Sequence, residues 1–152
     1  MIRFDAAVRI FTLSTPHTSY QMKVDADGCL LHTWYGRRLP EPCPDMAEPR
    51  APHNDPGCWP DLLPLEYPAP GAADNRCCAV CPEYADGTEA ADLRYVSYKI
   101  LPGKYSLPAM PAFREDANAE SLCITLQDAA GLRAELWYAV YPDCDLITRA
   151  AV

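Results

Sequence analysis

The sequence predicts an all-β protein in which antiparallel strands form a sandwich or a barrel. Short stretches in which apolar and polar residues alternate recur along the chain, and a period of two residues is typical of strands. Turn-forming dipeptides such as Asp27-Gly28 and Asp86-Gly87 separate these stretches. No stretch combines a sustained apolar stripe at the helical period with helix caps. Regularly spaced short strands therefore indicate an antiparallel sheet protein.

Two groups of strands are expected, and the first lies before residue 40. Residues 2–14 alternate imperfectly and predict one strand. Residues 18–24 alternate cleanly and predict a second strand. Residues 25–28 contain a hairpin dipeptide, so residues 29–35 are expected to return as an antiparallel partner.

The second group of strands follows residue 76. Residues 77–84 predict a short strand, and residues 93–105 predict a longer one with Val96, Tyr98 and Ile100 on a common face. Residues 107–119 hold turn formers without a period and are expected to form a loop. Residues 120–141 have the clearest pattern and predict a hairpin. Residues 146–152 predict the start of one more strand. Because the chain stops within that strand, we expect an incomplete sheet.

A proline-rich connection, residues 37–76, separates the two groups. Ten of the chain's sixteen prolines fall between Pro40 and Pro70, which excludes a helix or a central strand there. Apolar residues nevertheless cluster in this segment, namely Trp59, Leu62, Leu63, Leu65 and Tyr67. We therefore expect an ordered loop that is pinned to the sheets and presents polar groups at the surface.

Length and charge limit the classes of function. A chain of 152 residues corresponds to one domain, 1–152, with a sizeable core. Its net charge of −8 and the lack of a Lys/Arg-rich block argue against nucleic acid and anionic membranes as partners. The apolar runs are too short to span a membrane, and the charged N-terminal stretch does not fit a signal peptide. We expect a cytoplasmic protein.

Cofactors and metals are not expected. The sequence has no glycine-rich phosphate loop and no G-x-S-x-G nucleophile turn, and His17, His32 and His53 follow no metal-ligand spacing. The eight cysteines are expected to be reduced thiols, with disulfides and a metal site as the alternatives. They are Cys29, Cys43, Cys58, Cys77, Cys78, Cys81, Cys123 and Cys144.

Carboxylates and aromatic rings in the proline-rich loop are the one combination that points to a ligand. Asp45, Asp55, Asp61 and Glu66 share this loop with Trp59. Sugars pack their apolar faces on aromatic rings while their hydroxyl groups donate to carboxylates, so these residues fit a sugar-binding surface. The alternative is that the apolar residues only anchor the loop and the acidic residues are solvated.

An ordered set of short phrases resembles the N-terminal portion of bacterial α-galactosidases of glycoside hydrolase family 36, over about residues 2–152. The phrases are Phe11-Thr-Leu-Ser-Thr15, Thr18-Ser-Tyr20, Gly28-Cys-Leu-Leu-His32, Trp34-Tyr-Gly36, Glu66-Tyr-Pro68 with Gly71, Asp74-Asn-Arg76, Asp92-Leu-Arg-Tyr95, Gly103-Lys104, Leu107-Pro-Ala-Met110 and Ile147-Thr-Arg149.

The resemblance implies a specific fold and activity. It implies an antiparallel β-supersandwich of the galactose-mutarotase type, followed in the whole enzyme by a catalytic (β/α)8 barrel that this chain lacks. Such enzymes remove terminal α-galactosyl residues from raffinose-type sugars with retention of configuration, using two barrel aspartates. The segment alone would then have no catalytic residue, and it would pack on the barrel and form homo-oligomer contacts, as in family tetramers.

The resemblance also assigns a role to the loop. In tetrameric members, loops of the N-terminal domain reach the active site of a neighbouring subunit. By position, Asp45, Asp55 and Trp59 would then contact the α-galactoside at the rim of that site. This chain departs from its relatives at residues 56–58, where Pro-Gly-Cys replaces a stretch that tends to carry a basic residue. The alternative function is a stand-alone carbohydrate-binding β-sandwich module.

Overall fold

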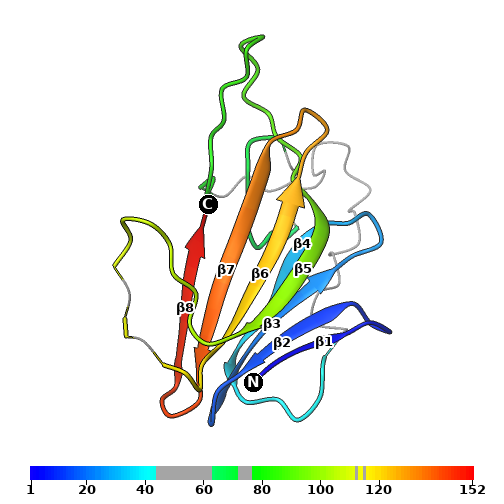
Figure 1. Ribbon diagram of the computed structural model, residues 1–152. Helices are drawn as coiled ribbons and strands as arrows, with labels where there is room; N and C mark the ends of the chain where they lie inside the picture. Colours follow the sequence, from blue (N-terminus) through cyan, green and yellow to red (C-terminus); the bar gives the residue numbers. More distant parts are fainter. Residues whose placement is uncertain (44–62, 72–76, 112, 115) are drawn as a thin grey trace.

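The computed structural model describes residues 1–43, 63–71, 77–111, 113–114 and 116–152. Within these residues the chain forms two four-stranded antiparallel sheets and no helix, which confirms the all-β prediction (Figure 1). The first sheet runs in the order β1-β2-β3-β4 and the second in the order β5-β6-β7-β8. Their bounds are β1 Ile2–Asp5, β2 Ile10–Ser14, β3 Thr18–Val24, β4 Leu30–Arg37, β5 Arg94–Pro102, β6 Glu120–Gln127, β7 Arg133–Tyr141 and β8 Leu146–Ala151. The described part of the chain contains no helix with the length and apolar character that a bilayer span needs.

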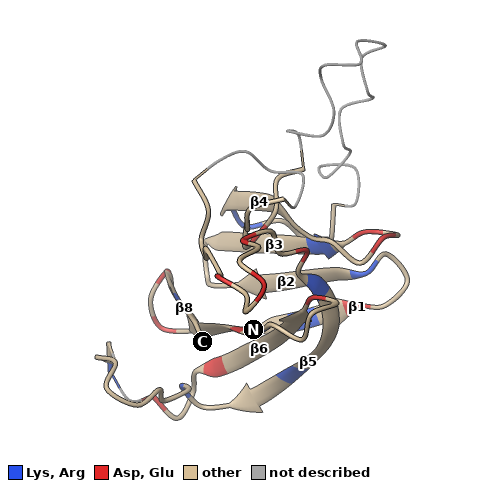
Figure 2. Cartoon of the chain, turned by 90° about the horizontal axis from the view of Figure 1, so that it is seen from above, with Lys and Arg blue, Asp and Glu red and all other residues tan. Residues whose placement is uncertain are grey.

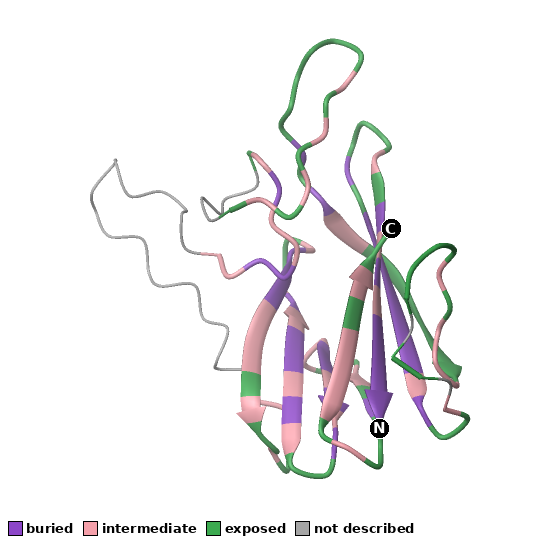
Figure 3. Cartoon of the chain, turned by 90° about the vertical axis from the view of Figure 1, so that its left-hand side faces the viewer, coloured by how far each residue is buried: buried purple, intermediate pink, exposed green. Residues whose placement is uncertain are grey.

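The two sheets stack as layers and share one hydrophobic core (Figure 2). Phe11 and Met22 of the first sheet are fully buried, as are Ile124 and Leu136 of the second. Figure 3 shows that buried positions lie along the strands, whereas the turns are mostly exposed. A hydrogen bond of 2.6 Å from the Ile2 backbone N–H to the Glu120 carboxylate also joins β1 to β6. Alternating apolar residues thus fill the space between the layers, as expected for a sandwich.

The prediction of one strand over residues 2–14 is wrong, because this stretch is the hairpin of β1 and β2. The Asp5 carboxylate accepts a hydrogen bond of 3.0 Å from the Ala7 N–H and so starts the turn. Arg9 ends it with a φ of 56° and donates a hydrogen bond of 2.6 Å to the Asp25 carbonyl oxygen. Ala6 and Val8 continue the apolar alternation through the turn, so the periodicity contains no sign of it.

The prediction of a strand over residues 77–84 is also wrong. This segment is irregular and contacts another irregular segment, through a hydrogen bond of 2.8 Å from the Ala79 N–H to the Pro68 carbonyl. The turn expected at Asp86-Gly87 is present, since the Gly87 N–H donates to the Tyr84 carbonyl and Gly87 has a φ of 81°. A short apolar run that contains proline does not provide the continuous donors of a strand.

The remaining strand predictions are confirmed, with one shift in register. The hairpin over 120–141 pairs Glu120 with Val140 and Gln127 with Arg133. On β5, an irregularity between Tyr95 and Ser97 interrupts the alternation. Val96 is therefore 54% exposed instead of sharing the inner face with Tyr98.

The side of the sandwich formed by β1, β2 and β5 is closed by aromatic rings. The Phe11 ring lies 4.4 Å from Phe4, 5.1 Å from Tyr98 and 6.1 Å from Tyr95, measured between centroids. Phe4 and Tyr98 also approach each other to 4.8 Å. This aromatic cluster joins the two sheets by apolar packing. The opposite side, near β4 and β8, is closed by polar groups instead.

Candidate functional site

The residues predicted to contact sugar, Asp45, Asp55 and Trp59, lie outside the described residues. The two ends of the loop that carries them are described, over 37–43 and 63–71. Both ends are fixed to the first sheet by hydrogen bonds. The loop therefore leaves and rejoins the sandwich at defined points.

Two buried polar side chains of β3 hold the first end. Ser19 accepts a hydrogen bond of 3.0 Å from the Leu39 N–H, and Gln21 accepts one of 3.3 Å from the Cys43 N–H. The Gln21 amide also donates to Thr12 at 3.1 Å. Ser19 and Gln21 occupy the polar face of β3, yet both are completely buried. Their burial indicates that polar positions on this face are used to bind backbone, since buried polar groups require partners.

The second end of the loop is fixed to the strand β4. Leu65 forms a β-bridge with Leu31, and these two residues share a small apolar cluster with Cys29 and Leu63. The His32 N–H donates to the Pro64 carbonyl at 2.7 Å, and a further backbone bond of 2.9 Å links the next residue of the loop, Glu66, to Leu30. The prediction that Leu63 and Leu65 anchor the loop is confirmed.

The residue that follows this bridge, Glu66, forms the centre of a polar cluster. Its side chain is 1% exposed. The Tyr20 hydroxyl donates to the carboxylate at 2.7 Å and the Tyr138 hydroxyl at 2.8 Å. Arg149 Nη2 lies 3.2 Å from Glu66 Oε1 and also donates to the Glu66 backbone carbonyl. His32 Nδ1 lies 3.4 Å from Glu66 Oε2. We call these five residues the Glu66 cluster.

The Glu66 cluster links both sheets to the loop. Tyr20 and His32 belong to β3 and β4 of the first sheet, whereas Tyr138 and Arg149 belong to β7 and β8 of the second. Glu66 itself belongs to the loop, so one carboxylate connects three parts of the fold. The expectation that the acidic residues of this loop are solvated or presented at the surface is therefore wrong for Glu66. A buried charge requires partners of this kind, because an unpaired carboxylate would be expensive to desolvate.

Charge complementarity sets the ionisation of the cluster. Burial on its own would raise the pKa of Glu66, but the contacts with His32, Arg149, Tyr20 and Tyr138 outweigh burial and hold that pKa below its usual range. Burial and the charge of Glu66 raise the pKa of the Tyr20 and Tyr138 hydroxyl groups. Glu66 is therefore ionised at neutral pH, and both tyrosines remain protonated donors.

The lowered pKa of Glu66 predicts a loss of stability in acid. A carboxyl group whose pKa is lower in the folded state stabilises that state above its unfolded pKa, about 4.5, and loses this contribution as the pH falls through the folded pKa. We expect the free energy of unfolding of the wild-type chain to fall below pH 4.5 more steeply than that of Glu66→Gln. Urea unfolding between pH 7 and pH 3 measures this difference. Parallel pH profiles for the two chains would contradict the ionised state assigned to Glu66.

Two adjoining cavities open beside the Glu66 cluster. One has a volume of about 450 Å³ and includes His32, Glu66 and Cys77 in its lining, and the other has a volume of about 240 Å³ and includes Tyr35 and Ile147. Tyr20 and Arg149 line both cavities.

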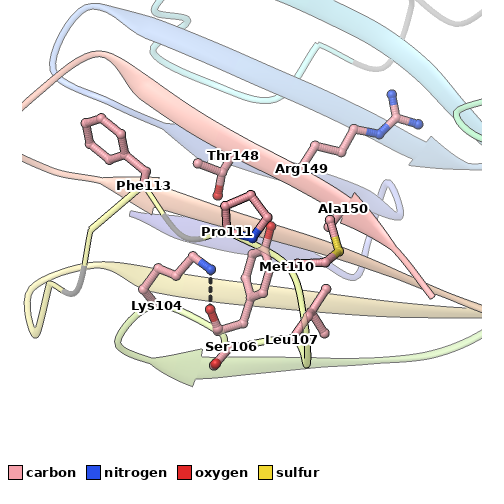
Figure 4. A pocket seen from close by; sticks show the side chains of 10 residues that line it. Lys104, Ser106, Leu107, Met110, Pro111, Phe113, Thr148, Arg149 and Ala150 are labelled. Carbon is pink, nitrogen blue, oxygen red and sulfur yellow. Dashed lines mark hydrogen bonds between the residues drawn. The ribbon is translucent and has the colours of Figure 1, made fainter.

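A third pocket, of about 100 Å³, lies under Met110 and Phe113. Figure 4 shows that Arg149 points away from it, toward the first sheet. Its small volume makes this pocket a poor ligand site.

Four of the phrases that carry the family resemblance meet in the Glu66 cluster. Thr18-Ser-Tyr20, Gly28-Cys-Leu-Leu-His32, Glu66-Tyr-Pro68 and Ile147-Thr-Arg149 each contribute one side chain, although the phrases are spread along the chain. Sequence reasoning did not assign His32 or Arg149 to a site. Their occurrence in these phrases is the one feature of the sequence that could have identified them. Neither the strand period nor the spacing of residues along the chain predicts that they lie together.

The described residues contain neither a disulfide nor a cysteine cluster that could bind a metal ion. The seven cysteines among them are free thiols, and no group of three or more His, Cys, Asp or Glu side chains there is arranged to hold a metal ion. Cys58 lies outside the described residues. Burial and the nearby Asp25 raise the pKa of Cys29 to about 11, so this thiol is protonated and weakly nucleophilic at neutral pH. The chemistry that the Glu66 cluster can supply is binding and positioning.

Comparison with known sequences places these features in context. The model of the glycosyl hydrolase family 36 N-terminal domain matches residues 28–152. The bifunctional alpha-galactosidase/sucrose kinase AgaSK of Mediterraneibacter gnavus is 38% identical over 93% of this chain, which corresponds to 16% of that protein. The alpha-galactosidase Mel36A of Lactobacillus acidophilus is 31% identical over 99% of this chain and 22% of its own length. The chain thus spans about a fifth of the length of these relatives.

Solved structures are similar over the same region. The galactosidase domain of AgaSK superposes with a TM-score of 0.87 at 36% identity, over 99% of this chain and 22% of that chain. The alpha-galactosidase AgaB from Geobacillus stearothermophilus superposes with a TM-score of 0.86 at 32% identity, over 99% of this chain and 22% of its own. Both matches include the two sheets that form the Glu66 cluster.

Proposed function

This chain belongs to glycosyl hydrolase family 36, and from that membership we propose that it acts as the non-catalytic N-terminal segment of an α-galactosidase. The observation that carries the proposal is the match of 99% of the chain to the galactosidase domain of AgaSK at a TM-score of 0.87. The larger enzyme would hydrolyse terminal α-galactosyl residues of raffinose-type sugars by a retaining mechanism, with both catalytic aspartates in a (β/α)8 barrel outside residues 1–152. The proposal includes a cytoplasmic location for this enzyme and a reaction that needs no cofactor.

Within that enzyme the segment would have three roles. It would pack on the catalytic barrel, contribute contacts to a homotetramer, and extend the loop 37–76 to the rim of a neighbouring subunit's active site. The hydrogen bonds at 39–43 and 64–66 support the third role, because a loop that is fixed at both ends can place a side chain reproducibly. The alternative of a stand-alone carbohydrate-binding module is not favoured, since the relatives are named as enzymes and the chain matches only part of each.

The proposal is tested by expressing the coding sequence with and without the part that follows codon 152. We expect the 152-residue chain to leave p-nitrophenyl α-galactoside and raffinose intact, and the extended protein to hydrolyse both. A stop codon directly after codon 152, or an extension without α-galactosidase activity, would refute the proposed function.

The loop residues are tested in the extended enzyme. Removal of a charged hydrogen-bond partner of a sugar costs about 1.5–3 kcal/mol, so Asp45→Ala and Asp55→Ala are each expected to reduce kcat/KM for raffinose by roughly 10- to 100-fold. Trp59→Ala is expected to raise KM through loss of stacking. Glu89→Ala, an exposed substitution elsewhere, is the control and should leave the kinetics unchanged. Wild-type kinetics for all three loop variants would remove these residues from the subsite.

A further inference from the structure

The turn between β7 and β8 contacts the β2–β3 turn, residues 15–17, so the two sheets meet at this end of the sandwich (Figure 1). Asp145, the residue directly before β8, provides the contact. Its Oδ1 accepts hydrogen bonds from the Thr15 hydroxyl at 2.6 Å and from the His17 backbone N–H at 2.9 Å. Its Oδ2 lies 2.6 Å from His17 Nδ1. One carboxylate next to the second sheet thereby fixes a turn of the first.

The contact depends on the charge of Asp145. The hydrogen bonds from Thr15 and His17 lower the pKa of Asp145 to about 2, so this carboxylate is ionised at neutral pH. Hydrogen bonds to an ionised acceptor are roughly twice as strong as those between neutral groups. Asp143, in the same turn, pairs with Arg114 instead. Asp145 is thus the acidic residue of this turn that links the sheets.

The β2–β3 turn in its own right holds the first end of the loop 37–76. The Arg38 backbone N–H donates to the His17 carbonyl at 2.7 Å. The Arg38 guanidinium donates to the Thr15 carbonyl at 3.3 Å. A shift of the turn would move both acceptors. Asp145 therefore acts on the point where the loop leaves β4 through the turn that lies between them.

The second end of the loop is contacted from the same strand of the second sheet. Arg149 of β8 donates to the Glu66 backbone carbonyl and lies 3.2 Å from the Glu66 carboxylate. Glu66 joins the loop to the first sheet, because its N–H donates to the Leu30 carbonyl at 2.9 Å. Asp145 and Arg149 lie four residues apart in the chain. One strand and the turn before it therefore reach both ends of a loop that leaves and rejoins the other sheet.

We propose that Asp145 and Arg149 are positioning residues for the loop 37–76, with Asp145 fixing its first end through the β2–β3 turn and Arg149 fixing its second end at Glu66. The β7–β8 hairpin would then set both loop ends relative to the second sheet. Such control matters for a loop that contacts a substrate, because a displacement of about 1 Å costs up to roughly 100-fold in rate. The effect on substrate rests on the proposed function, whereas the effect on the loop ends does not.

Amide hydrogen exchange of the isotope-labelled 152-residue chain, followed by NMR, tests the first end. Asp145→Ala is expected to speed exchange of the Arg38 amide about 10-fold through local opening. The amide of Ile124, in the centre of β6, should keep its wild-type rate. Asp145→Asn retains an acceptor oxygen for the turn and should restore most of the protection. Asp143→Ala, in the same turn, is the matched control and should leave Arg38 unchanged.

The same measurement tests the second end separately. Arg149→Lys keeps a positive charge beside Glu66 but loses the planar fork of donors. We expect the Glu66 amide to exchange about 3- to 10-fold faster, with the Arg38 amide unchanged. Arg133→Lys, which alters an exposed arginine on the neighbouring strand β7, should affect neither amide.

Kinetics of the extended enzyme with raffinose test the consequence for the substrate. Asp145→Ala is expected to raise KM about 3- to 10-fold and to leave kcat within twofold, because the loop is proposed to bind sugar and not to react with it. Asp145→Asn should return KM close to the wild-type value, and Asp143→Ala should leave it unchanged. A residue that only stabilises the fold would instead lower the amount of active enzyme, and therefore the apparent kcat, at constant KM.

Three results would overturn the proposal. The first is wild-type exchange at Arg38 in Asp145→Ala, and the second is an equal acceleration at Arg38 and Ile124, which would indicate general destabilisation. The third is an unchanged KM in an active Asp145→Ala enzyme. An extended wild-type protein without activity would refute the proposed function instead, and the exchange rates of the 152-residue chain would still decide whether Asp145 and Arg149 position the loop ends.

Discussion

Glu66→Ala is expected to lower the free energy of unfolding by about 3–5 kcal/mol, the usual cost of removing one partner from a buried ion pair. The substitution leaves the Tyr138 hydroxyl, which is almost fully buried, without its acceptor. It also removes the acceptor of Tyr20 and the counter-charge of Arg149. Each buried group that loses its partner costs about 1–3 kcal/mol. Urea unfolding at pH 7, monitored by tryptophan fluorescence, measures the change.

Two further variants separate the role of charge from the role of shape. Glu66→Gln keeps the side-chain volume and one acceptor oxygen. It should therefore lower the free energy of unfolding relative to the wild type, but by less than Glu66→Ala does. Glu135→Ala removes a more exposed carboxylate that pairs with the exposed Arg133, and it should cost less than about 1 kcal/mol. A cost for Glu66→Ala no larger than that for Glu135→Ala would show that the Glu66 cluster does not hold the sheets together.

Much of the fold was predictable because alternation and turn chemistry are local properties. Apolar residues recur with a period of two at Leu122, Ile124 and Leu126, and the turn after Gln127 is closed by an Asp128 carboxylate that accepts a hydrogen bond of 2.8 Å from the Leu132 N–H. The turn at Asp27-Gly28 likewise needs the positive φ of Gly28, 84°, which glycine adopts without strain. Such features are encoded within a few residues and are visible in the sequence.

The errors arise where the deciding contact is distant in the sequence or does not disturb the period. Ala6 and Val8 continue an apolar alternation through a turn, and the irregularity after Tyr95 moves one residue to the other face of β5. The burial of Glu66 depends on Tyr138 and Arg149, 72 and 83 residues away. An acidic residue in a proline-rich loop has the composition of a solvated group, and only the tertiary structure shows its partners.

The two sides of the sandwich are held by different physical interactions. On one side Phe11 contacts Phe4 and Tyr98 through apolar ring surfaces. On the other side Glu66 and Arg149 combine charge with hydrogen bonds. Apolar packing does not depend on ionisation, whereas the contribution of Glu66 is lost when its carboxylate is protonated. Acid is therefore expected to weaken the side that carries the Glu66 cluster before it weakens the aromatic side.

Phe11→Ala tests this difference. Phe11 is completely buried between the sheets, and removal of a buried phenylalanine side chain costs about 3–5 kcal/mol through lost transfer free energy and the cavity that remains. This cost should be the same at pH 7 and pH 3. The cost of Glu66→Ala should instead shrink at pH 3, because the stabilisation from a carboxylate whose pKa is lowered in the folded state declines as the pH falls below about 4.5. Urea unfolding of both variants at the two pH values measures the changes, with the partly exposed Phe4→Ala as a control of smaller cost. If the cost of Phe11→Ala fell with pH as steeply as that of Glu66→Ala, the two sides would not be held independently, and acid would loosen the sandwich as a whole.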